Sequence, residues 1–290
     1  MKTHHCIVMI LLFSVILSSC QPEQVRVSEE DHLGCQPREI TEGTCTLAEE
    51  DSNNVGLFET INEERVQTRD AAYSETATGF LAQPAEEGTY PGVIMIHEWW
   101  GLNDNIKTMA KLLAQEGYVV LAVDLYEGKV ATTSEEAGSL AGTARANPEQ
   151  AVANMQDAAS FLRGLPNVDG SKIASVGWCF GGGQSLQLAI SGEKLAATVI
   201  YYGSLTDDRE KLSSIAWPVL GIFGEEDTSI PVSSVNAFEK SLNALGIENE
   251  IFIYPGVGHA FANPSGQRYA PEETKDAWEK TLAFLGKHLK

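Results

Sequence analysis

Short, almost unbroken apolar runs recur along most of the chain and alternate with amphipathic stretches. The apolar runs predict buried strands at residues 92–97, 118–123, 172–177, 196–202, 219–224 and 250–254, because continuous hydrophobicity is typical of strands covered on both faces. Helical spacing of apolar residues predicts helices at residues 103–117, 148–164, 181–192, 232–246 and after Pro271. This alternation predicts an α/β domain at residues 65–290, with a mostly parallel central sheet and helices on both faces.

The first 19 residues follow a different pattern. Lys2 precedes an apolar run at residues 7–17, which is too short to span a bilayer comfortably and is typical of a secretory signal peptide. The run ends in Leu17-Ser18-Ser19-Cys20, which resembles a bacterial lipobox. We therefore expect residues 1–19 to be removed, Cys20 to be lipidated, and the protein to be exported and lipid-anchored to a membrane of the bacterial cell envelope. An ordinary signal peptide cleaved nearby is the alternative.

Residues 20–64 lack sustained hydrophobic periodicity. They are acidic and poor in large apolar side chains, a composition typical of a tether rather than a packed domain. Cys35 and Cys45 lie in this stretch and are candidates for a disulfide bond in an oxidising compartment. Cys179 is then left as an unpaired thiol in an exported protein.

The charge balance narrows the range of partners. The chain has 40 acidic and 20 basic residues, which give a formal net charge of −20. Such a surface repels phosphate backbones. The balance therefore argues against nucleic-acid binding and for action on small molecules, and it does not predict the oligomeric state.

Residues 177–181 carry the clearest chemical motif. They read Gly-Trp-Cys-Phe-Gly between an apolar strand and a glycine-rich helix start, which is the G-x-nucleophile-x-G arrangement with Cys179 at the nucleophile position. The glycines make room for a strained turn that places the sulfur at the amino end of the next helix, where partial positive charge favours a thiolate. The alternative is an inert buried cysteine whose neighbouring glycines serve helix packing.

Two residues further along the chain suit the roles of acid and base. Asp227 follows the strand at residues 219–224, and His259 follows the strand at residues 250–254. The chain order of nucleophile, acid and base is that of the α/β-hydrolase arrangement. In that arrangement His259 takes the thiol proton, and Asp227 fixes the imidazole tautomer and stabilises the imidazolium. The alternatives are an exposed loop histidine and an aspartate that caps a helix.

From residue 79 onward the chain resembles the dienelactone hydrolases. The resemblance is carried by Ile96-His97-Glu98-Trp99-Trp100-Gly101, Asp124-Leu125-Tyr126, Gly177-Trp178-Cys179-Phe180-Gly181-Gly182 and Gly258-His259-Ala260-Phe261. It implies an α/β-hydrolase fold and a triad of Cys179, Asp227 and His259. It also implies that Glu98 contacts the resting thiol, and that the backbone N–H groups of Phe180 and Trp99 form the oxyanion hole.

The sequence departs from the dienelactone hydrolases where they hold a substrate carboxylate with two arginines. One arginine position falls at Glu127-Gly128-Lys129, and the other falls at Asn263. Lys129 and Arg268 are the candidate substitutes, but the alignment alone does not support either of them. We therefore expect neutral substrates to be preferred to dienelactone. The residues expected to line the substrate pocket are Trp100, Tyr126, Phe261 and Asn263.

No metal or organic cofactor is expected. His97 and Glu98 begin an H-E-x-x-H zinc motif, but Gly101 stands at the position of its second histidine. The favoured interpretation is an exported hydrolase that cleaves an ester or lactone by acyl transfer to Cys179. The alternative is a non-catalytic envelope lipoprotein that uses the hydrolase fold to bind a ligand or partner.

Overall fold

The computed structural model describes residues 61–290, and in it eight strands form one sheet in the order β1-β2-β4-β3-β5-β6-β7-β8. Among these strands, β2 runs antiparallel to both of its neighbours, and every pair from β4 to β8 is parallel. The strands are β1 (Val66–Ala72), β2 (Thr78–Pro84), β3 (Tyr90–Ile96), β4 (Val119–Val123), β5 (Val168–Trp178), β6 (Ala197–Tyr201), β7 (Val219–Gly224) and β8 (Asn249–Tyr254). The mostly parallel sheet predicted from the apolar runs is confirmed.

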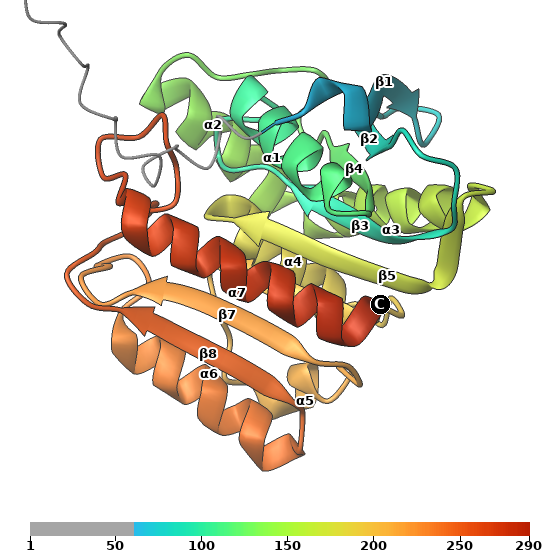
Figure 1. Ribbon diagram of the computed structural model, residues 1–290. Helices are drawn as coiled ribbons and strands as arrows, with labels where there is room; N and C mark the ends of the chain where they lie inside the picture. The colour runs from blue at the N-terminus through green and yellow to red at the C-terminus, as the bar shows by residue number, and fades with distance from the viewer. Residues whose placement is uncertain (1–60) are drawn as a thin grey trace, which may run out of the picture. The chain divides into compact units, whose positions relative to one another are not determined.

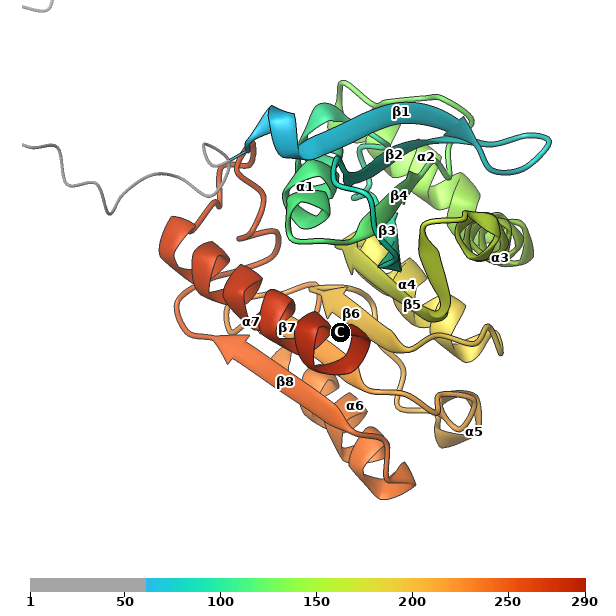
Figure 2. The same cartoon turned by 45° about the vertical axis from the view of Figure 1, so that its right-hand side comes forward.

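Helices cover both faces of this sheet (Figures 1 and 2). They are the short 3-10 helix η2 (Glu63–Arg65), α1 (Asp104–Gln115), α2 (Ser134–Ala146), α3 (Pro148–Gly164), α4 (Phe180–Ile190), α5 (Arg209–Leu212), α6 (Val232–Leu245) and α7 (Pro271–Leu289). Strand β3 shows how the two faces are filled. Val93 and Met95 pack in the apolar cluster that contains α1 and α7, whereas Ile94 and Ile96 pack in the cluster that contains α3.

The parallel strands bring distant parts of the sequence to one edge of the sheet. The segments that follow β3, β4, β5, β7 and β8 all begin at the carboxyl ends of these strands. In open α/β sheets this edge is where ligands bind and where catalytic residues gather. Every candidate catalytic residue of the sequence lies in one of these segments.

Five described elements were not predicted: strands β1 and β2, helix α2 and the short helices η2 and α5. Strands β1 and β2 pair over Val66↔Pro84 to Ala72↔Thr78 at the edge of the sheet, and α2 lies between the segment after β4 and α3. The folded part also begins before residue 65, because Glu63 pairs with Lys111 of α1 at 2.8 Å.

The predicted signal peptide, the lipidation of Cys20 and the pairing of Cys35 with Cys45 lie outside the described residues. Within residues 61–290, none of the helices has the length and apolar character needed to cross a membrane.

Candidate active site

Cys179 occupies a sharp turn between β5 and α4. Its backbone has φ 55° and ψ −115°, a left-handed conformation that is unfavourable for a residue with a side chain. A Cβ atom at Gly177 would clash with the carbonyl group of Gly181, and a Cβ atom at Gly181 would clash with the end of β3. The two glycines therefore permit the close approach of strand and helix that places Cys179 at the amino end of α4.

The side chains of Cys179, His259 and Asp227 form a continuous hydrogen-bonded row. The Nε2 atom of His259 lies 3.0 Å from the Cys179 sulfur, and its Nδ1 atom lies 2.7 Å from Oδ2 of Asp227. The Asp227 side chain is fully buried, and its Oδ1 atom accepts hydrogen bonds from the amides of Ser229 (2.8 Å) and Ile230 (2.9 Å). The sequence-predicted triad residues are thus brought together, with a fixed carboxylate behind the imidazole.

Burial and hydrogen bonding act in opposite directions on the triad. Burial lowers the pKa of His259, but the hydrogen bonds to Asp227 and Cys179 outweigh it and raise the pKa to about 10. Burial raises the pKa of Asp227, but the His259 hydrogen bond and the two backbone amides outweigh it and lower the pKa below its usual value. At neutral pH the geometry therefore favours an imidazolium between a carboxylate and the sulfur.

Glu98, expected beside the thiol, is held by Asn263. Its carboxylate accepts a hydrogen bond from the Nδ2 group of Asn263 and makes no hydrogen bond to the Cys179 sulfur. Burial raises the pKa of Glu98 to about 7, and the positive charge of His259 and the Asn263 hydrogen bond partly offset that rise. The carboxyl group is only 3% exposed, so it lies within the electrostatic field of the site.

Asn263, which was expected in the substrate pocket, is a buried residue in contact with Glu98. Its side chain is buried between Glu98 and the following turn, where its Oδ1 atom accepts hydrogen bonds from the amide (2.9 Å) and hydroxyl (2.7 Å) of Ser265. Both ends of the amide are therefore engaged by protein groups. Asn263 therefore fixes the position of Glu98, with one of its two Nδ2 hydrogens committed to that carboxylate.

His97, set aside in the sequence as an incomplete zinc motif, joins two segments of the site. The residue is fully buried, and its Nε2 atom accepts a hydrogen bond from the Leu125 amide at 3.2 Å. Its Nδ1 atom therefore carries the proton and donates to the carbonyl oxygen of Glu98 at 2.6 Å. Burial lowers the pKa of His97, which keeps the ring neutral and preserves this bridge between the ends of β3 and β4.

The two amides expected to form the oxyanion hole are free to donate. Phe180 is the first residue of α4, where backbone N–H groups have no partner within the helix. Neither its N–H nor that of Trp99 donates a hydrogen bond to another described residue. Trp99 and Trp100 are half-buried, and their rings meet edge to face at 5.1 Å. Trp99 packs against the small apolar cluster that also holds Phe180 and Cys179, so its ring lies beside the nucleophile.

Phe261 was expected in the substrate pocket and instead belongs to the core. Its side chain is fully buried, and its ring packs against Tyr202 at 5.7 Å and Tyr254 at 5.3 Å. Tyr126 lies closer to the predicted site. The centre of its ring is 4.6 Å from the centre of the His97 ring and 5.5 Å from the centre of the Phe180 ring. The aromatic pattern alone could not separate a core residue from a residue beside the nucleophile.

Arg145 is a residue that the sequence reasoning missed. It projects from α2, and its guanidinium group lies 5.4 Å from the centre of the Phe180 ring. Burial raises the pKa of Tyr126, and the positive charge of Arg145 partly offsets that rise. The sequence signal for Arg145 was weak, because it lies near the end of a helix whose one large apolar residue is Leu140.

The two cations considered as substitutes for the missing arginines lie in different hollows. Arg268 and His259 line one groove of about 550 Å³, whereas Lys129 and Tyr126 line a separate pocket of about 230 Å³. Lys129 and Arg268 are therefore not arranged to bind one carboxylate together. Among residues 61–290 no group of three or more His, Cys, Asp or Glu side chains is arranged to hold a metal ion.

Comparison with known proteins identifies the family. The model of the dienelactone hydrolase family matches residues 77–289. The chain belongs to the dienelactone hydrolase family. This dienelactone hydrolase family member is an enzyme of the ester- and lactone-hydrolase class.

Individual relatives cover most of the domain. This family member is 33% identical over 246 residues to a protein of Saccharolobus solfataricus named "Putative carboxymethylenebutenolidase". The match covers 71% of this chain and 92% of the relative. It is 34% identical over 217 residues to Protein usf of Aquifex pyrophilus, with 73% and 93% covered. A crystal structure of a dienelactone hydrolase-like promiscuous phosphotriesterase from metagenomic libraries gives a TM-score of 0.72 at 24% identity, with 78% and 100% covered. This likeness confirms the predicted α/β-hydrolase fold.

Proposed function

We propose that this enzyme cleaves a neutral carboxylic ester or lactone through an acyl-enzyme on Cys179. The observation that carries the proposal is the row of contacts in which His259 joins the Cys179 sulfur to the buried Asp227 carboxylate. A binding protein has no need of such a row, whereas acyl transfer needs a nucleophile, a proton carrier and a group that orients it.

The first half of the reaction forms the acyl-enzyme. The Cys179 thiolate attacks the substrate carbonyl carbon, and the carbonyl oxygen gains negative charge that the N–H groups of Phe180 and Trp99 stabilise. The bond to the leaving oxygen then breaks, and the His259 imidazolium gives its proton to that oxygen. The alcohol leaves, or in a lactone stays attached at the other end of the opened ring.

The second half releases the acid. Neutral His259 takes a proton from a water molecule, and the resulting hydroxide attacks the thioester carbonyl carbon. The carbon–sulfur bond breaks, which restores the thiolate, and the imidazolium is again held by Asp227. Throughout the cycle Asp227 keeps the Nδ1 proton in place, so Nε2 is the atom that exchanges protons.

The preference for neutral substrates is supported by the charges around the sulfur. Asn263, at one of the arginine positions, is buried and held by Glu98 and Ser265. Lys129 and Arg268 line separate hollows. None of these three residues therefore offers a bidentate partner to a substrate carboxylate, and the net charge of −20 disfavours the approach of an anion.

Replacement of the thiol tests the reaction. Cys179→Ala in the full chain should lower kcat for a neutral aryl ester by at least about 10³-fold, because little catalysis remains when a nucleophile is removed from a triad. Brief incubation with the ester should add one acyl mass to Cys179 in the unaltered enzyme. Gln156→Leu, at a partly exposed position of α3, is the matched control. Near-normal turnover by Cys179→Ala, or acylation of another residue, would contradict the proposal.

We also propose that lipidated Cys20 anchors the enzyme to an envelope membrane. The proposal is supported by the apolar run at residues 7–17 and by the small residues directly before Cys20.

A further inference from the structure

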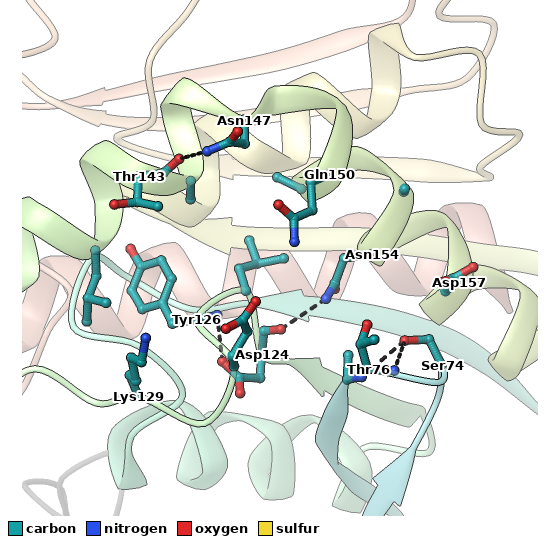
Figure 3. A pocket seen from close by; sticks show the side chains of 17 residues that line it. Ser74, Thr76, Asp124, Tyr126, Lys129, Thr143, Asn147, Gln150, Asn154 and Asp157 are labelled. Carbon is teal, nitrogen blue, oxygen red and sulfur yellow. Dashed lines mark hydrogen bonds between the residues drawn. The ribbon is translucent and has the colours of Figure 1, made fainter.

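Two tyrosine hydroxyl groups in the described part of the chain are buried without a hydrogen-bond partner, those of Tyr126 and Tyr202. Tyr126 borders the pocket beside α2 and α3 that Figure 3 shows. Tyr202 lies beside the triad instead, because the centre of its ring is 5.3 Å from the centre of the His259 imidazole. A buried hydroxyl without a partner costs free energy, so its retention next to a catalytic residue needs an explanation.

The backbone and the ring contacts of Tyr202 fix where its hydroxyl lies. The residue follows β6 directly and has φ 35°, a left-handed conformation that is unfavourable for a residue with a side chain. Its amide donates to the carbonyl oxygen of Ile222 in β7 at 2.7 Å, and the centre of its ring is 5.7 Å from that of Phe261. Strain of this kind persists where the surrounding structure imposes it, and it is frequent at active sites.

The Tyr202 side chain borders a narrow gap that Glu98 and Asn263 also line. The gap has no room for a water molecule, so the hydroxyl needs a partner from the protein itself. The Ala262 amide beside the phenol oxygen can only donate to it. The O–H proton is therefore still without an acceptor.

Glu98 has the matching acceptor. Asn263 donates to Oε2 of Glu98, and Oε1 accepts no hydrogen bond from the described residues. The other polar side chains at the gap suit the phenol less well. Oδ1 of Asn263 already accepts two hydrogen bonds from Ser265, and Asn105 is half-exposed, so water can hydrate its amide. A donor without an acceptor and an acceptor without a donor thus line the same gap.

The charges at this place favour the phenol as the donor. Burial raises the pKa of Tyr202 well above its ordinary value, and the charges of Glu98 and Cys179 add to the rise, so the hydroxyl keeps its proton. The hydrogen bond is strongest when its acceptor is an ionised carboxylate. Helix α1 presents only uncharged residues to the gap. The titratable groups around it are Glu98 after β3, Cys179 before α4, Tyr202 after β6, Asp227 after β7 and His259 after β8.

We propose that Tyr202 is a positioning residue of the active site, whose hydroxyl donates a hydrogen bond to Oε1 of ionised Glu98 while its ring supports the His259 imidazole. The bond forms when the Glu98 carboxyl group loses its proton and turns toward the phenol across the gap. The negative charge held there and the positive charge of His259 stabilise each other. This inference rests on the proposed acyl transfer, in which the His259 imidazolium gives its proton to the leaving oxygen.

Infrared titration of the full chain measures this hydrogen bond without turnover. The signal is the absorption of the protonated carboxyl group that disappears in Glu98→Gln, followed from about pH 5 to about pH 9. Tyr202→Phe keeps the ring and should raise the midpoint of this signal by about one to two pH units, because a hydrogen bond to the ionised form is lost.

Tyr201→Phe is the matched control. The Tyr201 hydroxyl lies 2.7 Å from Oγ1 of Thr281 and donates to the carbonyl oxygen of Ala277 at 3.0 Å, so it is directed at α7. Its removal should leave the Glu98 midpoint unchanged.

The pH profile of kcat/KM for a neutral aryl ester tests the link to catalysis. Near about pH 6.5, Tyr202→Phe should lower kcat/KM by about two- to tenfold, and the difference should vanish by about pH 9, where Glu98 is ionised in both proteins. In a Glu98→Gln background, Tyr202→Phe should have no further effect, because the acceptor has lost its charge.

The proposal is overturned by an unchanged or lowered midpoint in Tyr202→Phe, or by equal shifts in Tyr202→Phe and Tyr201→Phe. A loss of activity that is the same at every pH and persists in the Glu98→Gln background would also overturn it, because only the packing of the ring would then matter. Ester turnover by Cys179→Ala would instead refute the proposed reaction and leave the infrared result intact.

Discussion

Replacing Glu98 with glutamine is expected to change how the stability of the fold depends on pH. Burial holds the pKa of Glu98 at about 7, against 4.5 for the ordinary group. A carboxyl group whose pKa is raised on folding binds its proton more tightly in the native state. Its contribution to stability is therefore fully present below pH 4.5 and is lost as the pH rises through 7.

The size of the loss follows from the two pKa values. A shift from 4.5 to about 7 corresponds to about 3 kcal/mol over the whole titration. Between about pH 5.5 and about pH 8, where both states can be measured, the loss is about 2 kcal/mol. Solvent screening does not reduce this value, because Glu98 is only 3% exposed. Glutamine stays neutral and still offers an oxygen to Asn263, so Glu98→Gln should lose about 2 kcal/mol less over the same interval.

Guanidinium unfolding at the two pH values, followed by tryptophan fluorescence, measures this difference. The quantity to compare is the change in unfolding free energy between the two pH values, because other titrating groups then cancel between variants. Glu279→Gln, which removes a carboxylate from an exposed position of α7, is the matched control and should behave as the unaltered protein. The reasoning is refuted if Glu98→Gln and Glu279→Gln show the same pH dependence.

Three further outcomes are expected. Gly181→Ala should destabilise the protein by at least about 1–3 kcal/mol and lower kcat, because the added methyl group clashes with the end of β3; a thermal melt and an ester assay check this, and an unchanged melting temperature with full activity would contradict it. The kcat/KM for a neutral aryl ester should exceed that for a dienelactone by about 10²-fold, since two charge-assisted hydrogen bonds are missing; a preference for the dienelactone that disappears in Lys129→Gln or Arg268→Gln would show that a cation replaces the arginines. Cys20→Ala should abolish lipid attachment and membrane partitioning in a bacterial host, as judged by mass spectrometry and fractionation; an unmodified Cys20 in the unaltered mature protein would refute the anchor.

The sequence predicted those elements whose burial leaves a strong hydrophobic pattern. Residues 219–224 are apolar throughout, and β7 spans the same residues. Strand β1 gave no such signal, because it lies at the sheet edge and most of its side chains are exposed. Helix α2 was missed because only Ala137 and Ala141 are buried along it, and two alanines do not produce a detectable apolar face.

The sequence predicted those site residues whose positions are determined by the ends of strands. Cys179, Asp227 and His259 each follow a strand of the parallel part of the sheet, so their convergence follows from topology. The pairing of Glu98 with Asn263 joins positions 165 residues apart, and no local pattern indicates it. The sequence showed only that an arginine position held asparagine, and it could not show that a buried carboxyl group takes up the asparagine side chain.

The left-handed backbone of Cys179 has an evolutionary consequence. A residue with φ 55° and ψ −115° is held there against its own preference, at a cost of about 1–3 kcal/mol. Glycine would relieve that strain, so we expect the cysteine to persist only while its chemistry is needed. If a descendant of this chain lost its substrate, this position should be among the first to drift toward glycine, and its fold should gain stability as it does so.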